Sequence, residues 1–198
     1  MSTGKKSHPL ETEIKLPMQG PGPARRLLRK LDFRVIRRRH LERNELFDFV
    51  DGRLRKKGCV LRLRFTAGSC LLTFKGRPLG LRPHKVRREI EVETKEGRSL
   101  RQILEMAGLM SVLRYEKYRT LYASQVRKRR RSSGVIALDE TPVGTFLELE
   151  GSPLWIDRTA RRLGFSREDY LTETYPTLYS RHFRRQGGKA GRKVFKGR

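Results

Sequence analysis

Charged and apolar side chains alternate along many short segments of the chain. In the segment RLRF, residues 62–65, the two arginines share one face of an extended strand and the two apolar side chains share the other, because successive side chains of a strand point in opposite directions. Comparable patterns, bounded by turn residues, predict eight strands. They cover residues 8–16, 46–50, 59–64, 70–75, 85–94, 115–126, 135–139 and 146–150.

The turn at residues 66–69 joins two of these strands into a predicted hairpin. A register with Arg62 opposite Thr73 places Arg62, Arg64 and Lys75 on one face. The same register pairs Cys70 with residue 65, so the two cysteines, at 59 and 70, lie roughly 20 Å apart along the strands. A disulfide requires Cα atoms within about 7 Å. We therefore expect two free thiols.

Four segments show the apolar spacing of helices: residues 24–31, 99–109, 153–163 and 166–179. Ser166 and Asp169 have the spacing of a capping box at the start of the last one. Strands in hairpins with a few helices favour one α+β domain with an antiparallel sheet. We place this catalytic domain at residues 1–180 and expect residues 181–198, which are basic and have no hydrophobic period, to form a disordered tail.

The net charge narrows the choice of partner. The chain has 47 Lys and Arg against 21 Asp and Glu, a net charge of +26, which indicates a polyanionic partner. The tail holds eight of the basic residues and no acid, which leaves 39 − 21 = +18 for residues 1–180. The longest uncharged stretch has nine residues, too short for a membrane helix, and neither a secretory signal nor a CxxC motif is present. We expect a cytoplasmic protein that does not bind membranes.

The charges on the strand faces have both signs. A closed or strongly curved sheet would gather them in a lumen, where isolated ions are too costly and must find counter-ions. Clustered carboxylates bind a divalent cation, and clustered arginines and lysines bind phosphate oxygens. Together they predict a site for a metal ion and a triphosphate.

Several segments, in this order, resemble the CYTH superfamily, also called triphosphate tunnel metalloenzymes. The N-terminal pattern ExExK is matched by Glu11, Glu13 and Lys15. The later segments are HLERNELFD from residue 40, LRLRF from 61, LTFKG from 72, VRREIEVE from 86, YEKYRT from 115, ALDETPVGTFLELEG from 137 and TETYPTLY from 172. The resemblance spans about residues 8–180 and implies an eight-stranded antiparallel β-barrel, a tunnel with a charged lumen and helices outside.

The resemblance also implies roles for individual residues. Carboxylates from the first and last strands would hold Mg²⁺ or Mn²⁺: Glu11, Glu13, Asp139, Glu148 and Glu150. Basic residues would bind the triphosphate: Lys15, Arg62, Arg64, Lys75, Arg87, Lys117 and Arg119. Of these, Glu11, Glu13 and Lys15 would be catalytic. Glu89 and Glu91 would take a second metal or orient the arginines, and a homodimer is expected by resemblance alone.

Three functions remain open. The sequence slightly favours a class IV adenylyl cyclase that converts ATP to cyclic AMP and pyrophosphate. The alternative is a triphosphatase acting on tripolyphosphate, thiamine triphosphate or a nucleoside triphosphate. The third is a polyphosphate- or nucleic-acid-binding module without catalysis, using residues 34–43, 127–131 and the tail. His40 and His84 are interpreted as surface or turn residues rather than catalytic bases.

Overall fold

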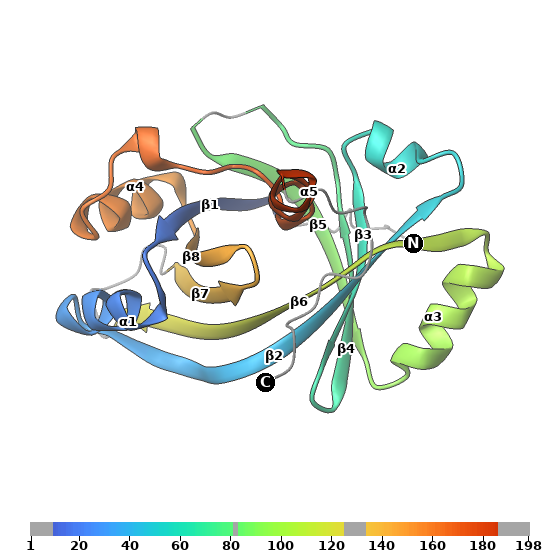
Figure 1. Ribbon diagram of the computed structural model, residues 1–198, viewed down its shortest axis with the longest axis horizontal. Helices are drawn as coiled ribbons and strands as arrows, with labels where there is room; N and C mark the ends of the chain where they lie inside the picture. Colours follow the sequence, from blue (N-terminus) through green and yellow to red (C-terminus); the bar gives the residue numbers. More distant parts are fainter. Residues whose placement is uncertain (1–9, 81–82, 125–133, 186–198) are drawn as a thin grey trace, which may run out of the picture.

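Eight antiparallel strands close into a barrel, as the sequence predicted (Figure 1). The structure is a computed structural model that describes residues 10–80, 83–124 and 134–185. Around the barrel the strand order is β1-β5-β4-β3-β2-β6-β7-β8. The strands are β1 (Leu10–Met18), β2 (Phe33–Phe49), β3 (Val60–Thr66), β4 (Ser69–Lys75), β5 (Lys85–Thr94), β6 (Leu109–Ser124), β7 (Val135–Thr141) and β8 (Gly144–Glu150).

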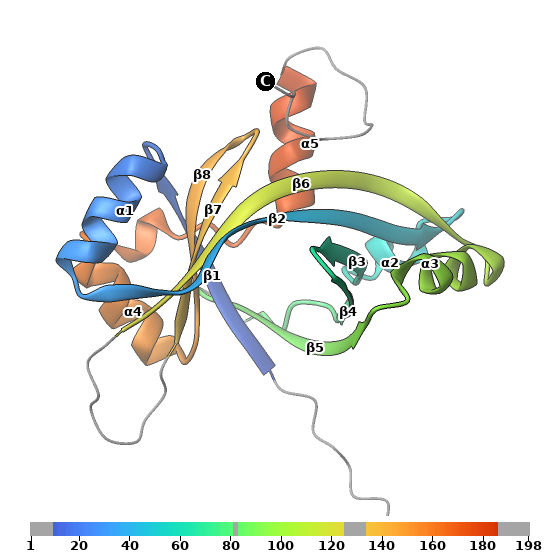
Figure 2. The ribbon, with the colours of Figure 1, turned by 90° about the horizontal axis from the view of Figure 1, so that it is seen from below.

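Helices lie on the outside of the barrel and at its ends (Figures 1 and 2). They are α1 (Pro21–Lys30), α2 (Arg53–Lys56), α3 (Gly97–Met106), α4 (Pro153–Arg162) and α5 (Tyr175–Arg185), with a 3-10 turn at Arg167–Asp169. None of the helices in the described part of the chain has the length and apolar character needed to cross a membrane.

The strand pairing sets which charges meet. The predicted pairing of Arg62 with Thr73 is confirmed, and both cysteines are free. On β1, Glu13 pairs with Lys85 of β5 on one side and with Glu150 of β8 on the other. The charged faces of the strands therefore converge inside the barrel.

Two strands are much longer than predicted. β2 and β6 have 17 and 16 residues, whereas the sequence predicted strands only from residue 46 and from residue 115. The first half of β2 is dominated by arginines, so its apolar alternation is hidden. Pairing with β6 over nearly its whole length holds it extended, with register shifts between Val35 and Arg37 and between Arg37 and His40.

The main hydrophobic core lies outside the barrel wall. Ile14 and Leu16 of β1 are fully buried against side chains of α1 and α4, among them Leu28 and Ile156. Lys15, between them in sequence, points to the opposite face and into the lumen. One strand thus supplies an apolar outer face and a charged inner face, as a period of two requires.

The predicted helix 166–179 is instead two separate elements. The capping box of Ser166 and Asp169 is confirmed, but the turn it begins ends at residue 169. The chain then runs extended, and Leu171 forms a bridge with Lys15 before α5 begins. Helix α5 continues to Arg185, five residues into the segment assigned to the tail. The basic segment 127–131 and residues 186–198 lie outside the described residues.

Candidate active site in the tunnel

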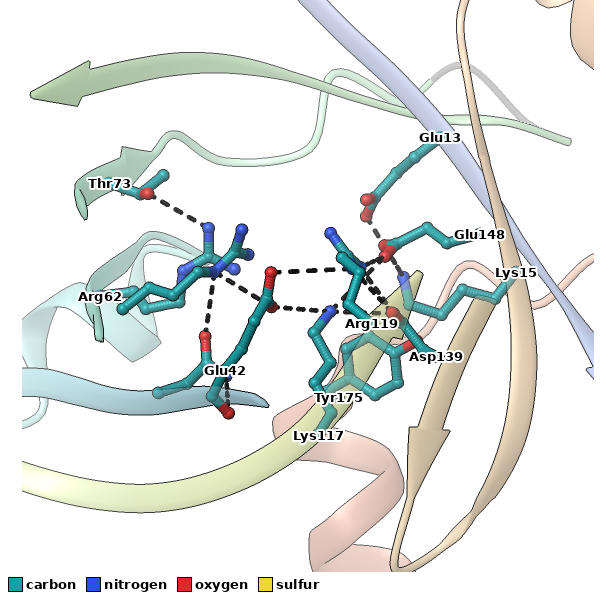
Figure 3. Close-up of polar contacts among 12 residues, drawn as sticks. Glu13, Lys15, Glu42, Arg62, Thr73, Lys117, Arg119, Asp139, Glu148 and Tyr175 are labelled. Atoms are coloured by element: carbon teal, nitrogen blue, oxygen red, sulfur yellow. Dashed lines mark hydrogen bonds and ion pairs between the residues drawn. The ribbon is translucent and has the colours of Figure 1, made fainter. Parts of the chain in front are cut away.

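Among the residues that the structure describes, equal numbers of basic and acidic side chains line the lumen of the barrel. The basic ones are Lys15, Arg62, Arg64, Lys75, Lys85, Arg87, Lys117 and Arg119; the acidic ones are Glu11, Glu13, Glu42, Glu89, Glu91, Asp139, Glu148 and Glu150. The central part of this network is drawn in Figure 3. All the site residues predicted from the sequence are in this set.

Asp139 anchors the middle of the network. It is fully buried, and Lys117 Nζ donates to its Oδ2 at 2.9 Å while Arg119 Nε donates to its Oδ1 at 2.7 Å. The hydroxyl of Tyr175, at the start of α5, donates to Oδ2 at 2.5 Å. Burial and the nearby Asp139 raise the pKa of Tyr175 well above its ordinary value, so the hydroxyl keeps its proton. Three donors already surround this carboxylate, which the resemblance assigned to a metal.

Glu42 was not predicted, although it lies at the centre of the basic groups (Figure 3). Its carboxylate is 3.3 Å from Arg64 Nε, 3.6 Å from Lys117 Nζ and 4.0 Å from Arg119 Nε. Burial alone would raise its pKa, but these cations hold it well below the ordinary value. The alternation of Glu42 and Asn44 in the segment HLERNELFD would have revealed it if β2 had been predicted at full length.

Lys15 lies between two carboxylates. Its Nζ is 3.0 Å from Glu148 and 3.4 Å from Glu13. Burial favours the neutral amine, but Glu13 and Glu148 outweigh that effect and raise the pKa of Lys15, so it stays charged. Lys85, a residue the sequence analysis missed, pairs with Glu13 from the neighbouring strand, and burial lowers its pKa to about 8 despite that partner.

Carboxylates are crowded near Lys75. Lys75 Nζ is 2.7 Å from Glu11 and 2.9 Å from Glu89. Burial would raise the pKa of Glu11, but hydrogen bonding to Glu89 and the charge of Lys75 lower it to about 2. Burial and Glu11 raise the pKa of Glu89 to about 8. Burial, together with Glu11 and Glu148, raises the pKa of Glu150 to about 7.

Two guanidinium groups in the lumen have unused donors. The Nε atoms of Arg62 and Arg87 are buried and have no hydrogen-bond partner within the described part of the chain. Arg62 Nη2 donates to Thr73 Oγ1 at 3.1 Å, and Glu91 lies 3.9 Å away. Both arginines line a small cavity of about 50 Å³ that Lys15, Lys75 and Lys85 also line. Buried unpaired donors of this kind fit the oxygens of a phosphate chain.

The carboxylates fit a divalent cation in their chemistry. Among the described residues, no three His, Cys, Asp or Glu side chains are already gathered around one point as a metal centre. However, Glu13 lies directly opposite Glu150, and like charges opposite each other in a sheet are unfavourable; Lys15 and Lys85 neutralise Glu13, which leaves Glu150 as the group that a cation would stabilise. The raised pKa values of Glu89 and Glu150 show the same crowding. Oxygen ligands of this type suit Mg²⁺ or Mn²⁺.

His84 lies in the turn before β5, one of the two settings expected from the sequence, but it is not at the surface. It is buried, and its Nε2 lies 2.8 Å from Asp157 of α4, outside the tunnel. Arg167 and Tyr170 donate to the same carboxylate and hold its pKa below the ordinary value against the effect of burial. The cluster joins α4 to the start of β5 and is a structural contact of the barrel wall.

The chain belongs to the CYTH domain family, whose sequence profile matches residues 9–175. No curated protein matches the chain significantly.

Solved structures share the fold at low sequence identity. A candidate adenylate cyclase from Vibrio parahaemolyticus is 18% identical with a TM-score of 0.73, covering 86% of this chain and 98% of that one. A protein from Pyrococcus horikoshii OT3 is 21% identical with a TM-score of 0.70, covering 87% and 99%. A candidate adenylyl cyclase from Hippeastrum, described as revealing a dominant triphosphatase activity, is 19% identical with a TM-score of 0.61, covering 87% and 96%. At these identities the likeness establishes the fold.

Proposed function

We propose that the protein is a metal-dependent triphosphatase that binds its substrate in the tunnel. The observation that carries the proposal is the buried set of lysines and arginines facing the lumen, two of which have unpartnered donors, beside a group of crowded carboxylates. Enzymatic phosphoryl transfer depends mainly on positioning and charge neutralisation, and this lumen supplies both.

The charge balance of the lumen supports a metal requirement. Eight acidic side chains face eight basic ones, and the raised pKa values of Glu89 and Glu150 leave these two acids partly protonated near neutral pH. A triphosphate with about four negative charges would still leave the closed barrel with an excess of negative charge. Divalent cations remove that excess. Glu11, Glu13, Glu148 and Glu150 would hold Mg²⁺ or Mn²⁺, which neutralises charge on phosphate oxygens when bound. Glu89 is the candidate for holding a further ion. Asp139 would not hold a metal but would keep the side chains of Lys117 and Arg119 in position.

The basic residues would bind and orient the phosphate chain. Arginines can grip two phosphate oxygens at once, which suits Arg62, Arg64 and Arg119, whereas lysines supply point charges. When substrate binds, each of these lysine and arginine side chains must replace a carboxylate partner by a phosphate oxygen. Glu42 and Asp139 would act as positioning residues that keep Lys117 and Arg119 in place during this exchange.

Hydrolysis fits the geometry better than cyclisation. Most side chains around the cavity are charged or polar, which suits a phosphate chain better than a nucleoside. Tripolyphosphate, which needs no base-binding surface, is therefore the first candidate substrate. An adenylyl cyclase activity, which the sequence favoured, is the second candidate, because Leu46, Val60 and Tyr115 form an apolar wall on which a purine could pack.

A product assay distinguishes these functions. Purified protein is incubated with tripolyphosphate, thiamine triphosphate or ATP and with Mg²⁺ or Mn²⁺, and phosphate, pyrophosphate and cyclic AMP are measured separately. We expect phosphate and pyrophosphate from tripolyphosphate, only in the presence of the metal. Cyclic AMP with equimolar pyrophosphate from ATP would favour the cyclase, and binding without any product would identify a non-catalytic module.

Two tunnel variants test the site itself. We expect Glu13→Gln and Arg64→Ala each to lower turnover by at least about 100-fold, since each removes a group that faces the reacting phosphates. In the Arg64→Ala variant the fold should persist, because Lys117 and Arg119 still neutralise Glu42. Arg98→Ala, an exposed change on α3, is the matched control. Near-normal activity of either tunnel variant would refute the proposed site.

A further inference from the structure

A second group of arginines, from α1 and β2, lies outside the tunnel. Figures 1 and 2 show α1 beside the start of β2 and the end of β6. Among the described residues, a pocket of about 610 Å³ here is lined by five arginines and by no lysine or acid: Arg25, Arg29, Arg34, Arg38 and Arg39. Its floor includes Thr120 and Tyr122 of β6. These residues alternate with the tunnel residues of the same strand, so the pocket is on the outer face of the barrel wall.

The pocket is built by irregular pairing of β2. Consecutive residues of a regular strand face opposite ways, yet Arg38 and Arg39 both line this pocket, as do Arg34 and Val35. Two of the three register shifts in the pairing of β2 with β6 fall within this stretch. Irregularities of this kind redirect side chains and are common next to functional sites.

Part of the pocket is held in a fixed geometry. Glu140 of β7 accepts a hydrogen bond from Arg25 Nη2 at 2.6 Å and from Arg39 Nε at 3.0 Å. The guanidinium of Arg39 also lies 3.5 Å from the ring centroid of Tyr118. In contrast, the guanidinium groups of Arg29 and Arg38 are exposed and make no hydrogen bond or ion pair within residues 10–80, 83–124 and 134–185.

From this arrangement we propose that the pocket binds a chain of phosphate groups, independently of the tunnel. Five guanidinium groups beside two carboxylates, Glu140 and Asp32, leave an excess of three positive charges, which favours an anion with several charges. Residues 34 to 39 extend over roughly 15 Å of strand, more than one phosphate spans. The aromatic side chains offer no open ring: Phe33 and Tyr122 are buried, and Arg39 covers Tyr118. Recognition is therefore of the phosphates rather than of bases. The backbone of single-stranded RNA and inorganic polyphosphate share this chemistry.

The test compares two variants with the same net charge in the full-length protein. The pocket variant carries Arg29→Gln, Arg34→Gln and Arg38→Gln and leaves the bonds to Glu140 intact. The control variant carries Lys56→Gln, Lys95→Gln and Arg98→Gln, exposed positions near α2 and α3. Binding of an oligouridylate of about 20 nucleotides, and of polyphosphate of similar length, is measured by competition at several salt concentrations.

We expect the pocket variant to bind at least about tenfold more weakly at moderate salt. The slope of the logarithm of the binding constant against the logarithm of the salt concentration should be shallower by about two. Each of the three lost phosphate contacts contributes about 0.7 to this slope on a single strand. The control variant should stay close to wild type. An effect on one ligand alone supports the pocket and names the source of the phosphates. Equal weakening of both variants, or no binding by wild type, would overturn the proposal.

Turnover of tripolyphosphate provides an independent readout. None of the three substituted arginines faces the lumen, so the pocket variant should keep the wild-type rate. Loss of that rate together with binding would show that the pocket belongs to the tunnel, and would overturn its independence. If the protein proves inactive toward every triphosphate, the binding comparison still decides the present inference.

Discussion

The tunnel and the outer arginine pocket both concentrate basic side chains, but they balance the charges differently. In the tunnel, the side chains of Lys117 and Asp139 are at most 1% exposed, and Lys117 Nζ lies 2.9 Å from Asp139 Oδ2. The described tunnel residues include eight carboxylates and eight basic side chains. In the pocket, the side chains of Arg25 and Arg39 are 42% and 45% exposed, and they share the single carboxylate of Glu140.

The difference follows from solvation. An ion removed from water must be paired, and breaking such a pair leaves an uncompensated charge at a cost of several kcal/mol. An exposed ion pair is solvated in either state and contributes about 1 kcal/mol or less. Charge in the tunnel is therefore part of the folded structure, while charge in the pocket is available to a partner and sensitive to salt.

The strongest test of this contrast removes one carboxylate from each region. Glu42→Gln removes the carboxylate that pairs with Arg64 and weakens the neutralisation of Lys117 and Arg119, which keep Asp139, and we expect the free energy of unfolding to fall by about 3 kcal/mol. Glu140→Gln, the matched change in the pocket, should cost about 1 kcal/mol or less. Urea unfolding of both variants and wild type measures the two effects. Equal losses would contradict the distinction between the regions.

Acidification should reduce the effect of Glu42. The folded-state pKa of Glu42 lies well below the ordinary 4.5, so its contribution to stability is fully present above that value and is lost as the pH falls toward the folded-state pKa. The stability difference between wild type and Glu42→Gln should therefore be constant near neutral pH and shrink below about pH 4.5. Urea unfolding at a series of pH values measures it. A difference that does not change with pH would show that Glu42 acts through packing rather than charge.

The same contrast explains which features could be predicted from sequence. The antiparallel strands and the Arg62–Thr73 register follow from alternation, because an apolar outer face and a charged inner face leave a period of two in the sequence. The closed barrel was implied by the family resemblance. The first half of β2 lacks this alternation of apolar and charged residues, because it consists mainly of arginines. Glu42, which faces the lumen, comes after these arginines in the sequence. Long-range pairing with β6, not local propensity, makes this segment a strand.

Contacts between segments that are distant in the sequence could not be predicted either. Tyr175 enters the tunnel because the chain turns at Leu171 and directs α5 over it, and only the folded chain brings its hydroxyl to Asp139. The outer pocket likewise combines two arginines of α1 with three of β2. The charge of these arginines was evident from the sequence, but their common location depends on packing and on the irregular strand pairing.

The smallest expected effects concern neutral donors in the same two regions. Tyr175→Phe removes a buried hydroxyl that donates to Asp139, and we expect a loss of about 1–2 kcal/mol in stability, because a charged acceptor strengthens the bond. Tyr122→Phe removes a hydroxyl that interacts with the half-exposed Arg25, and we expect about 0.5 kcal/mol, since water can replace that contact. Urea midpoints at unchanged m-value measure both. If Tyr122→Phe lowered the stability as much as Tyr175→Phe, hydrogen bonds would contribute equally in the two regions. The regions would then differ only in their net charge.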